Sequence, residues 1–391
     1  MASNKELLYQ ERLARYNTAC EGGKPDKVPI RLTLSEYAAK HAGLPLEEIY
    51  YDLDKNVIAV DKVLADFDID VVFGSPSLWW GAAHDAVGAK YAKFAGRHLA
   101  PNQQFQFVEN EYMLPDDYDD FIANPTRWIL EKLFPRIHEE FSEPGSWRGS
   151  LALIKGASSF LMANNKSLEA EKHWAQNYGI PLASKGMTKA PFDTLGDTLR
   201  GLKGIIKDLH RRPEELLKAL EVLIPHNIYY GMASSQYGDN LPIFMPLHRG
   251  SYPFLNPQQW STYYWAPLKK VIEGLWSQGK RTIFYAEGNW TPYLEEISEL
   301  PDHSIIFHVD KTDIGRAKKI LGSRFCLSGN VPNSLLAYGT PEQVREYVKR
   351  LLDDHAGDGG FIIDSAGIMQ IDVKTENLEA LIETTRKYGV Y

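Results

Sequence analysis

The chain has 391 residues, of which 44% are hydrophobic and 24% charged, and its 43 Lys and Arg against 51 Asp and Glu give a net charge of −8. This length suffices for one barrel-sized domain or two smaller ones. A mildly acidic chain without a long basic run is not suited to binding nucleic acid through its charge. No stretch approaches the roughly 18 consecutive apolar residues of a membrane span, and the charged N-terminal segment does not resemble a signal peptide. We therefore expect a cytoplasmic protein that binds neither nucleic acid nor membrane.

Eight short apolar runs alternate with longer amphipathic segments along the chain. The runs are continuous rather than alternating, which is typical of parallel strands that are buried on both faces. They predict strands over residues 28–34, 69–75, 180–187, 241–247, 281–287, 304–310, 324–330 and 359–365.

The segments between the later runs have helical patterns. Residues 267–279 place apolar side chains on one stripe. In residues 339–354, Thr340 caps the helix, Pro341 takes its first position and Gln343 completes a capping box. A closing helix is expected over 377–388. Eight strand–helix units predict an α/β protein with a (β/α)8 TIM barrel.

The N-terminal half contains an insertion of about 100 residues, over about 76–179, between the second and third strands. It includes a candidate hairpin at 104–113 and candidate helices near 116–141 and 150–163, and residues 162–179 belong with it. One crossover helix does not account for this length. We expect residues 1–391 to form one barrel domain, with the insertion forming a cap over the barrel mouth.

In such barrels the active site is built at the carboxyl ends of the strands. His248 follows the fourth strand, Glu287 ends the fifth, and His308 ends the sixth. These are nitrogen and oxygen ligands suited to a catalytic zinc with one open position. Other interpretations remain open: His248 as a substrate contact, Glu287 in a buried ion pair with Arg249 or Lys185, and His308 satisfied by a backbone carbonyl. Asp310 is expected to orient His308 or to cap the next helix.

Aromatic side chains gather in the loops after three of the strands. An aromatic ligand needs large apolar rings with a few polar groups, so these side chains are candidates for substrate binding, although they could equally pack the cap against the barrel. His84 and Lys185 are candidates to bind a carboxylate or hydroxyl group of the substrate. The candidate aromatic residues are Trp79, Trp80, Tyr252, Phe254, Trp290 and Tyr293.

The C-terminal half contains the segments "CLSGNVPNSLLAYGTPEQVREYVKRLLD", "GGFIIDSAGI" and "TENLEALIE", and the N-terminal half contains "KVPIRL" and "DFDIDVV". In these segments the chain resembles the uroporphyrinogen decarboxylase superfamily. The resemblance implies a (β/α)8 barrel. The arginine motif that the decarboxylase uses for its eight-carboxylate substrate is missing from the first strand. The His-x-Cys positions of the thiol methyltransferases hold Tyr285 and Glu287, and Ala366 stands near the position of their late Cys.

The remaining branch is similar to the O-demethylase methyltransferases, whose zinc motif is Glu-x14-Glu-x20-His. Glu287 and His308 fit the Glu-x20-His part. Glu273 lies one position off the first Glu and on the solvent side of its helix, so His248 is the preferred third ligand and Glu273 the alternative. The resemblance implies a zinc methyltransferase that demethylates methoxylated aromatic compounds. Asn289 and Asn330 join Glu287 and His308 as candidate catalytic residues.

The methyl acceptor would be the Co(I) centre of a corrinoid. Because the chain lacks an Asp-x-His-x-x-Gly motif, the resemblance implies that a separate corrinoid protein carries it. Alternative functions are a decarboxylase of a cyclic, tetrapyrrole-like substrate, a methyltransferase with another methyl donor, and a non-catalytic tetrapyrrole carrier. The oligomeric state is left open, with a homodimer as one option.

Overall fold

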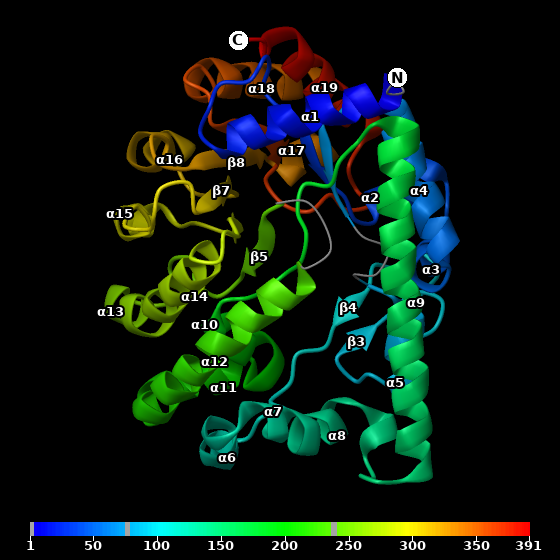
Figure 1. Ribbon diagram of the computed structural model, residues 1–391, viewed down its shortest axis with the longest axis vertical. Helices are drawn as coiled ribbons and strands as arrows, with labels where there is room; N and C mark the ends of the chain where they lie inside the picture. The colour runs from blue at the N-terminus through cyan, green and yellow to red at the C-terminus, as the bar shows by residue number, and fades with distance from the viewer. Residues whose placement is uncertain (1–3, 75–78, 236–240) are drawn as a thin grey trace.

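The computed structural model describes residues 4–74, 79–235 and 241–391. Its largest sheet is parallel and has the order β5-β6-β7-β8-β9 (Figure 1). These strands are Ile243–Leu247, Thr282–Ala286, Ile305–Val309, Cys326–Val331 and Phe361–Ser365. Each lies within or one residue beyond a predicted apolar run, and every residue of these five strands is buried. The continuous apolar runs of the sequence thus correspond to strands covered on both faces.

Shorter pairings close this sheet into a barrel. β1 (Arg31–Thr33) pairs in parallel with β2 (Val71–Phe73), and Ile30, next to β1, bridges to Ile363 in β9. On the other side, Leu182 bridges to β2 and Met187 bridges to β5. The predicted (β/α)8 fold is confirmed.

The strand predicted at 180–187 is present only as these isolated bridges. The Ala183 amide donates to the Val72 carbonyl, whereas the Lys185 amide donates to the Pro242 carbonyl. The segment therefore changes its hydrogen-bonded neighbour at Ser184, and neither ladder continues long enough to form a regular strand.

The helices that pack on the barrel in the C-terminal half follow the predicted pattern. Thr340 and Gln343 form the expected capping box of α18. The expected stripe of apolar residues on α14 is buried. The helices of this half are α10 (Pro191–Asp193), α11 (Gly201–Arg211), α12 (Pro213–Ser234), α13 (Pro257–Gln259), α14 (Ala266–Trp276), α15 (Leu294–Ile297), α16 (Ile314–Leu321), α17 (Asn333–Tyr338), α18 (Pro341–His355) and α19 (Thr375–Tyr388).

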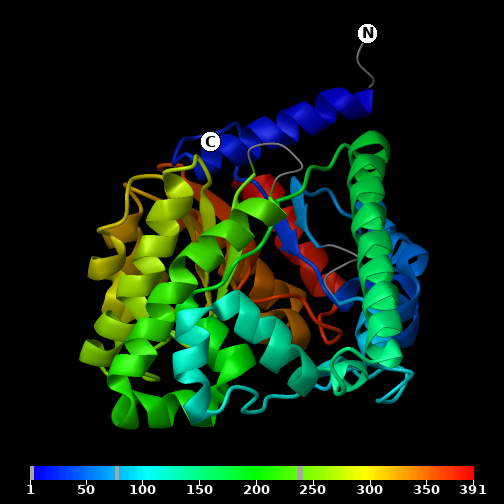
Figure 2. The ribbon, with the colours of Figure 1, turned by 60° about the horizontal axis from the view of Figure 1, so that its bottom comes forward.

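The N-terminal helix α1 (Asn4–Cys20) lies across one end of the barrel (Figure 2). Tyr16 and Cys20 pack with Ile283, Ile306 and Cys326, which stand near the beginnings of their strands. The Tyr16 hydroxyl donates to the Ala183 carbonyl at 2.8 Å. α1 therefore closes the amino end of the barrel, which leaves the carboxyl end for the site.

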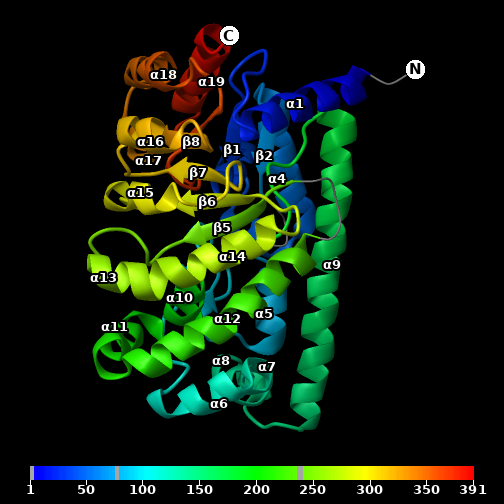
Figure 3. The same cartoon turned by 60° about the vertical axis from the view of Figure 1, so that its left-hand side comes forward.

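The insertion differs from its predicted form. Gln106–Phe107 (β4) pairs antiparallel with Ala92–Lys93 (β3), so the hairpin predicted within 104–113 is wrong. The two segments predicted at 150–163 and 162–179 form one helix, α9 (Trp147–Tyr178), which runs along one side of the molecule (Figure 3). The other N-terminal helices are α2 (Tyr37–Ala42), α3 (Leu46–Tyr51), α4 (Leu53–Asp66), α5 (Gly81–Val87), α6 (Tyr118–Ala123), α7 (Pro125–Trp128) and α8 (Phe134–Ile137).

The insertion contacts the barrel rim through an ion pair in which Arg249 Nη2 lies 2.9 Å from Glu109 Oε2.

Within the described part of the chain, no helix combines the length and the apolar composition needed to cross a membrane.

Candidate active site

The carboxyl ends of β5, β6 and β7 bring polar side chains to one part of the rim. His248 follows β5, Glu287 follows β6 and Asp310 follows β7. Because the parallel register pairs Leu247 with Ala286 and Ala286 with Val309, the three residues leave their strands at neighbouring positions. The predicted placement of His248 and Glu287 at the rim is confirmed.

His248 lies between two carboxylates. Its Nδ1–H donates to Asp197 Oδ2 at 2.6 Å, and its Nε2 lies 3.7 Å from Glu287 Oε1. Burial disfavours the imidazolium, but the hydrogen bond and the charge of Asp197 outweigh burial and raise the pKa of His248. Burial also raises the pKa of Glu287, against the opposing charge of His248. The pair therefore combines a stabilised cation with a carboxylate of raised proton affinity.

Asp193 and Asp197 fix the position of His248 through hydrogen bonds to its backbone amide and to its ring. Asp193 is fully buried and accepts hydrogen bonds from the Arg249 amide at 2.8 Å and the Tyr264 hydroxyl at 2.7 Å. Burial, and then the charge of Asp197, raise the pKa of Asp193 to about 6. Burial by itself would raise the pKa of Asp197. The hydrogen bond from His248 and the charge of Lys189 outweigh burial, so the pKa of Asp197 is lowered.

Sequence reasoning missed both of these aspartates. They lie four residues apart, at the end of α10 and in the π-helical turn Thr194–Leu199 that follows it. The usable signal was "PFDTLGD", in which two acids at helical spacing follow a predicted strand.

His308 lies in a different environment, inside the barrel. It is fully buried, and its ring stacks on Tyr285 with centroids 4.1 Å apart. Nδ1 lies 2.8 Å from Arg31 Nη2, and Nε2 lies 3.1 Å from the Ala366 carbonyl. Burial, and then the charge of Arg31, lower the pKa of His308 well below its usual range. The carbonyl interaction is the alternative that the sequence left open for this residue.

The predicted zinc ligands are therefore only partly assembled. His248 and Glu287 are adjacent, whereas both ring nitrogens of His308 already have partners. Across residues 4–74, 79–235 and 241–391, no group of three or more His, Cys, Asp or Glu side chains is arranged to hold a metal. Glu273 lies in the last turn of α14, the helix that leads into β6, and so belongs to the amino end of the barrel. The predicted three-ligand site does not fit this arrangement of side chains, and zinc itself stays a prediction.

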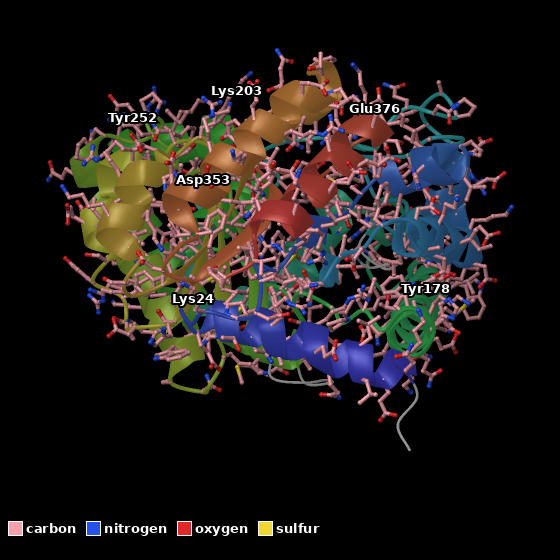
Figure 4. All side chains as sticks on the ribbon, turned by 90° about the horizontal axis from the view of Figure 1, so that it is seen from above. Lys24, Tyr178, Lys203, Tyr252, Asp353 and Glu376 are labelled. Carbon is pink, nitrogen blue, oxygen red and sulfur yellow. The ribbon has the colours of Figure 1, made fainter. Side chains whose placement is uncertain are left out.

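The other rim candidates shape the loops. The Asn289 side chain accepts from the Thr291 amide at 2.9 Å, and its carbonyl accepts from the Tyr252 amide at 2.8 Å. Asn330 donates to the Asp310 carbonyl at 3.2 Å and accepts from the Tyr347 hydroxyl at 2.9 Å. Tyr252 lies at the periphery of the molecule, where about half of its side chain is exposed (Figure 4).

Four predicted substrate-binding residues instead support the scaffold. Trp290 is fully buried, and its indole N–H donates to the Glu287 carbonyl at 2.9 Å. Trp79 stacks on Phe105 with centroids 4.0 Å apart, and His84 Nδ1 donates to the Trp80 carbonyl at 2.8 Å. These contacts match the alternative in which the rings pack the insertion and the loops.

Lys185, the last of the predicted substrate contacts, lies away from the rim residues. Its Nζ lies 2.6 Å from Glu171 Oε1 on α9. Its charge is therefore already compensated.

Comparison with known families identifies the barrel. The sequence profile described as uroporphyrinogen decarboxylase (URO-D) matches residues 167–388, which is more than half of the chain. The chain belongs to this family. Curated uroporphyrinogen decarboxylases are similar over shorter stretches. The enzyme of Ruthia magnifica is 26% identical over 141 residues, which cover 34% of this chain and 39% of that protein. The enzyme of Azoarcus is 31% identical over 128 residues, which cover 31% of this chain and 34% of that protein.

These matches span well under half the length of the curated relatives. A solved structure described as a methyltransferase from Methanosarcina mazei aligns over 96% of this chain and 98% of its own, with a TM-score of 0.64 and 16% identity. At this identity the likeness establishes the shared fold of the URO-D barrel.

Proposed function

We propose that this URO-D family member is a methyltransferase that demethylates methoxylated aromatic compounds and passes the methyl group to the Co(I) of a corrinoid on a separate protein. The observation that carries the proposal is the His248–Glu287 pair at the carboxyl ends of β5 and β6, with Asp197 behind the histidine. The fold shared with a methyltransferase over almost the whole chain supports it.

The charge of the rim argues against a substrate with many carboxylates. Arg249 pairs with Asp197 and Glu109, Lys189 pairs with Asp197, and Arg31 pairs with Asp364 inside the barrel. Asp193, Glu287 and Asp310 add further acidic groups at the same place. An eight-carboxylate porphyrinogen would therefore meet compensated cations and additional negative charge, which disfavours a decarboxylase of that class.

The protein groups fit the needs of ether cleavage. Breaking the bond between the methyl carbon and the aryl oxygen leaves the electron pair on the oxygen, which must then take up a proton. The reduced corrinoid supplies the electron pair for the new bond to the methyl carbon. His248, whose protonated form Asp197 stabilises, presents its Nε2–H toward the rim and can deliver that proton. Glu287 Oε1 lies 3.7 Å from the same Nε2, close enough for its charge to favour the protonated ring between turnovers.

Zinc would be an alternative to this acid, because a metal on Nε2 of His248 would take the place of the Nε2 proton and act as a Lewis acid at the aryl oxygen. Glu287 would be the second of the two predicted donors that the rim brings together, and Asp197 would orient the imidazole through Nδ1–H.

The test mixes the protein with a reduced corrinoid protein and a panel of methoxybenzenes, and follows the absorbance change of the corrinoid on methylation. We expect methylation with at least one methoxyarene and formation of the matching phenol. His248→Gln should slow it by roughly 10²–10⁴-fold, the usual contribution of a general acid. Methylation only with non-aromatic methyl donors would support the alternative methyl donor, and carbon dioxide release from a porphyrinogen would support the decarboxylase.

A further inference from the structure

A cleft lies between the middle of α9 and the barrel wall, apart from the rim residues. Its volume is about 230 Å³. It borders the place where residues 182–187 change their hydrogen-bonded neighbour from β2 to β5. The two ladders do not overlap there, and the cleft lies between this irregular part of the wall and α9, with lining residues from both. α9 runs along the same side of the molecule (Figure 3).

The lining of the cleft is largely apolar and aromatic. A cavity of about 150 Å³ lined by apolar side chains binds benzene, so this cleft has room for one aromatic ring with small substituents. Phe244 reaches through to the barrel interior, where its ring meets Tyr285 at 5.2 Å between centroids. The apolar lining residues are Val72, Phe73, Phe160, Leu168, Leu182, Met187 and Phe244.

Lys185 and Glu171 line the cleft and form an ion pair. This pair determines whether a charged or a neutral ligand fits. Lys185 is 11% exposed and Glu171 is 26% exposed, and both carboxylate oxygens of Glu171 contact the ammonium group. A ligand carboxylate would place a second negative charge beside a lysine that is already neutralised. A neutral hydroxyl instead leaves the pair intact, because each oxygen of Glu171 has a second lone pair that can accept an O–H.

We propose that this cleft binds an uncharged single-ring phenol, with the ring against Phe73 and Phe244 and the hydroxyl donating to Glu171. Phenols are also the products of the proposed reaction, and in naming this ligand class the inference rests on the proposed function. The binding itself is a property of the cleft and is measured without methyl transfer.

The experiment measures equilibrium binding of 2-methoxyphenol and of 2-methoxybenzoate to the full chain by isothermal titration calorimetry at about pH 7.5. At this pH the phenol, with a pKa of about 10, is neutral, whereas the carboxylic acid, with a pKa of about 4, is ionised. We expect the phenol to bind at least about tenfold more tightly than the benzoate. Glu171→Gln leaves Lys185 as an uncompensated cation, so the preference should reverse toward the benzoate.

A second pair of variants tests the location. Asn164 lines the cleft, and Asn165, its neighbour on α9, is exposed and does not line it. Asn164→Trp should abolish phenol binding, while the matched control Asn165→Trp should retain it. The inference would be overturned if the unaltered chain bound no phenol or bound the two probes equally. It would also be overturned if Asn164→Trp still bound the phenol. Phenol binding without methyl transfer would support the site in the cleft and contradict the proposed function. Methyl transfer without phenol binding would support the proposed function and contradict the site in the cleft.

Discussion

Arg31 Nη2 donates a hydrogen bond to His308 Nδ1 across 2.8 Å inside the barrel. Because a guanidinium has donors and no acceptor, His308 Nδ1 must be the acceptor. The ring is therefore neutral, with its proton on Nε2, and Nε2–H donates to the Ala366 carbonyl at 3.1 Å. A metal could bind Nε2 only after this hydrogen bond is broken. The geometry assigns His308 to the internal network of the barrel.

The first prediction separates this role from that of a zinc ligand. His308→Leu should destabilise the fold by about 1–3 kcal/mol, because the buried guanidinium of Arg31 loses an acceptor. It should leave the metal content of the purified protein unchanged. Thermal unfolding and elemental analysis measure the two effects. A variant of unaltered stability that has lost stoichiometric zinc would show instead that His308 is a ligand, as predicted from the sequence.

A second prediction concerns the buried pair Arg31–Asp364. Both side chains are essentially unexposed, Arg31 Nε lies 2.7 Å from Asp364 Oδ2, and Thr33 Oγ1 lies 2.6 Å from the same oxygen. Asp364→Asn should cost about 3–5 kcal/mol in free energy of unfolding, because it leaves a buried charge uncompensated.

The surface pair Arg127–Glu131 is the matched control, since both of its side chains are more than half exposed. Glu131→Gln should cost no more than about 1 kcal/mol. Denaturant unfolding compares the two variants, and similar small losses in both would contradict the account of Arg31–Asp364.

The third prediction is a pH dependence. The cation of His248 is the proposed acid, so methyl transfer should fall as the pH rises through the raised pKa of His248. Asp197→Asn removes the charge that raises this pKa, so the alkaline limb of the rate profile should move to lower pH. The pH profile of the rate, together with the NMR titration of the His248 ring, measures the shift. An alkaline limb that stays in place would argue against His248 as the acid.

The fourth prediction compares two glutamates that the sequence offered for the same site. Glu287→Gln should lower methyl transfer by at least about tenfold, since it removes the charged partner of His248 at the rim. Glu273→Gln should have little effect, because Glu273 lies on α14 near the opposite end of the barrel. Zinc analysis of both variants locates any metal: loss only in Glu287→Gln would place it at the rim, whereas loss in Glu273→Gln would restore the alternative ligand.

The barrel and part of its rim followed from local sequence patterns. Buried parallel strands need continuous apolar runs, so the positions of β5 to β9 could be read to within about two residues. Once the strands are located, the residues that follow them must meet at one end, which is why His248 and Glu287 were predicted correctly as neighbours. The segment at 180–187 was harder, because its irregularity depends on two different neighbouring strands.

By itself, then, the sequence determined where the strands of the C-terminal half lie and at which end of the barrel His248 and Glu287 meet. The tertiary structure decided which donors and acceptors meet. Arg31 and His308 are 277 residues apart in the chain, and Asp197 and His248 are 51 residues apart. No periodicity or spacing encodes such contacts. They raise the pKa of His248 and lower that of His308, because the protonation of a buried imidazole depends on its partners and on the surrounding water. Both are set only when the chain has folded.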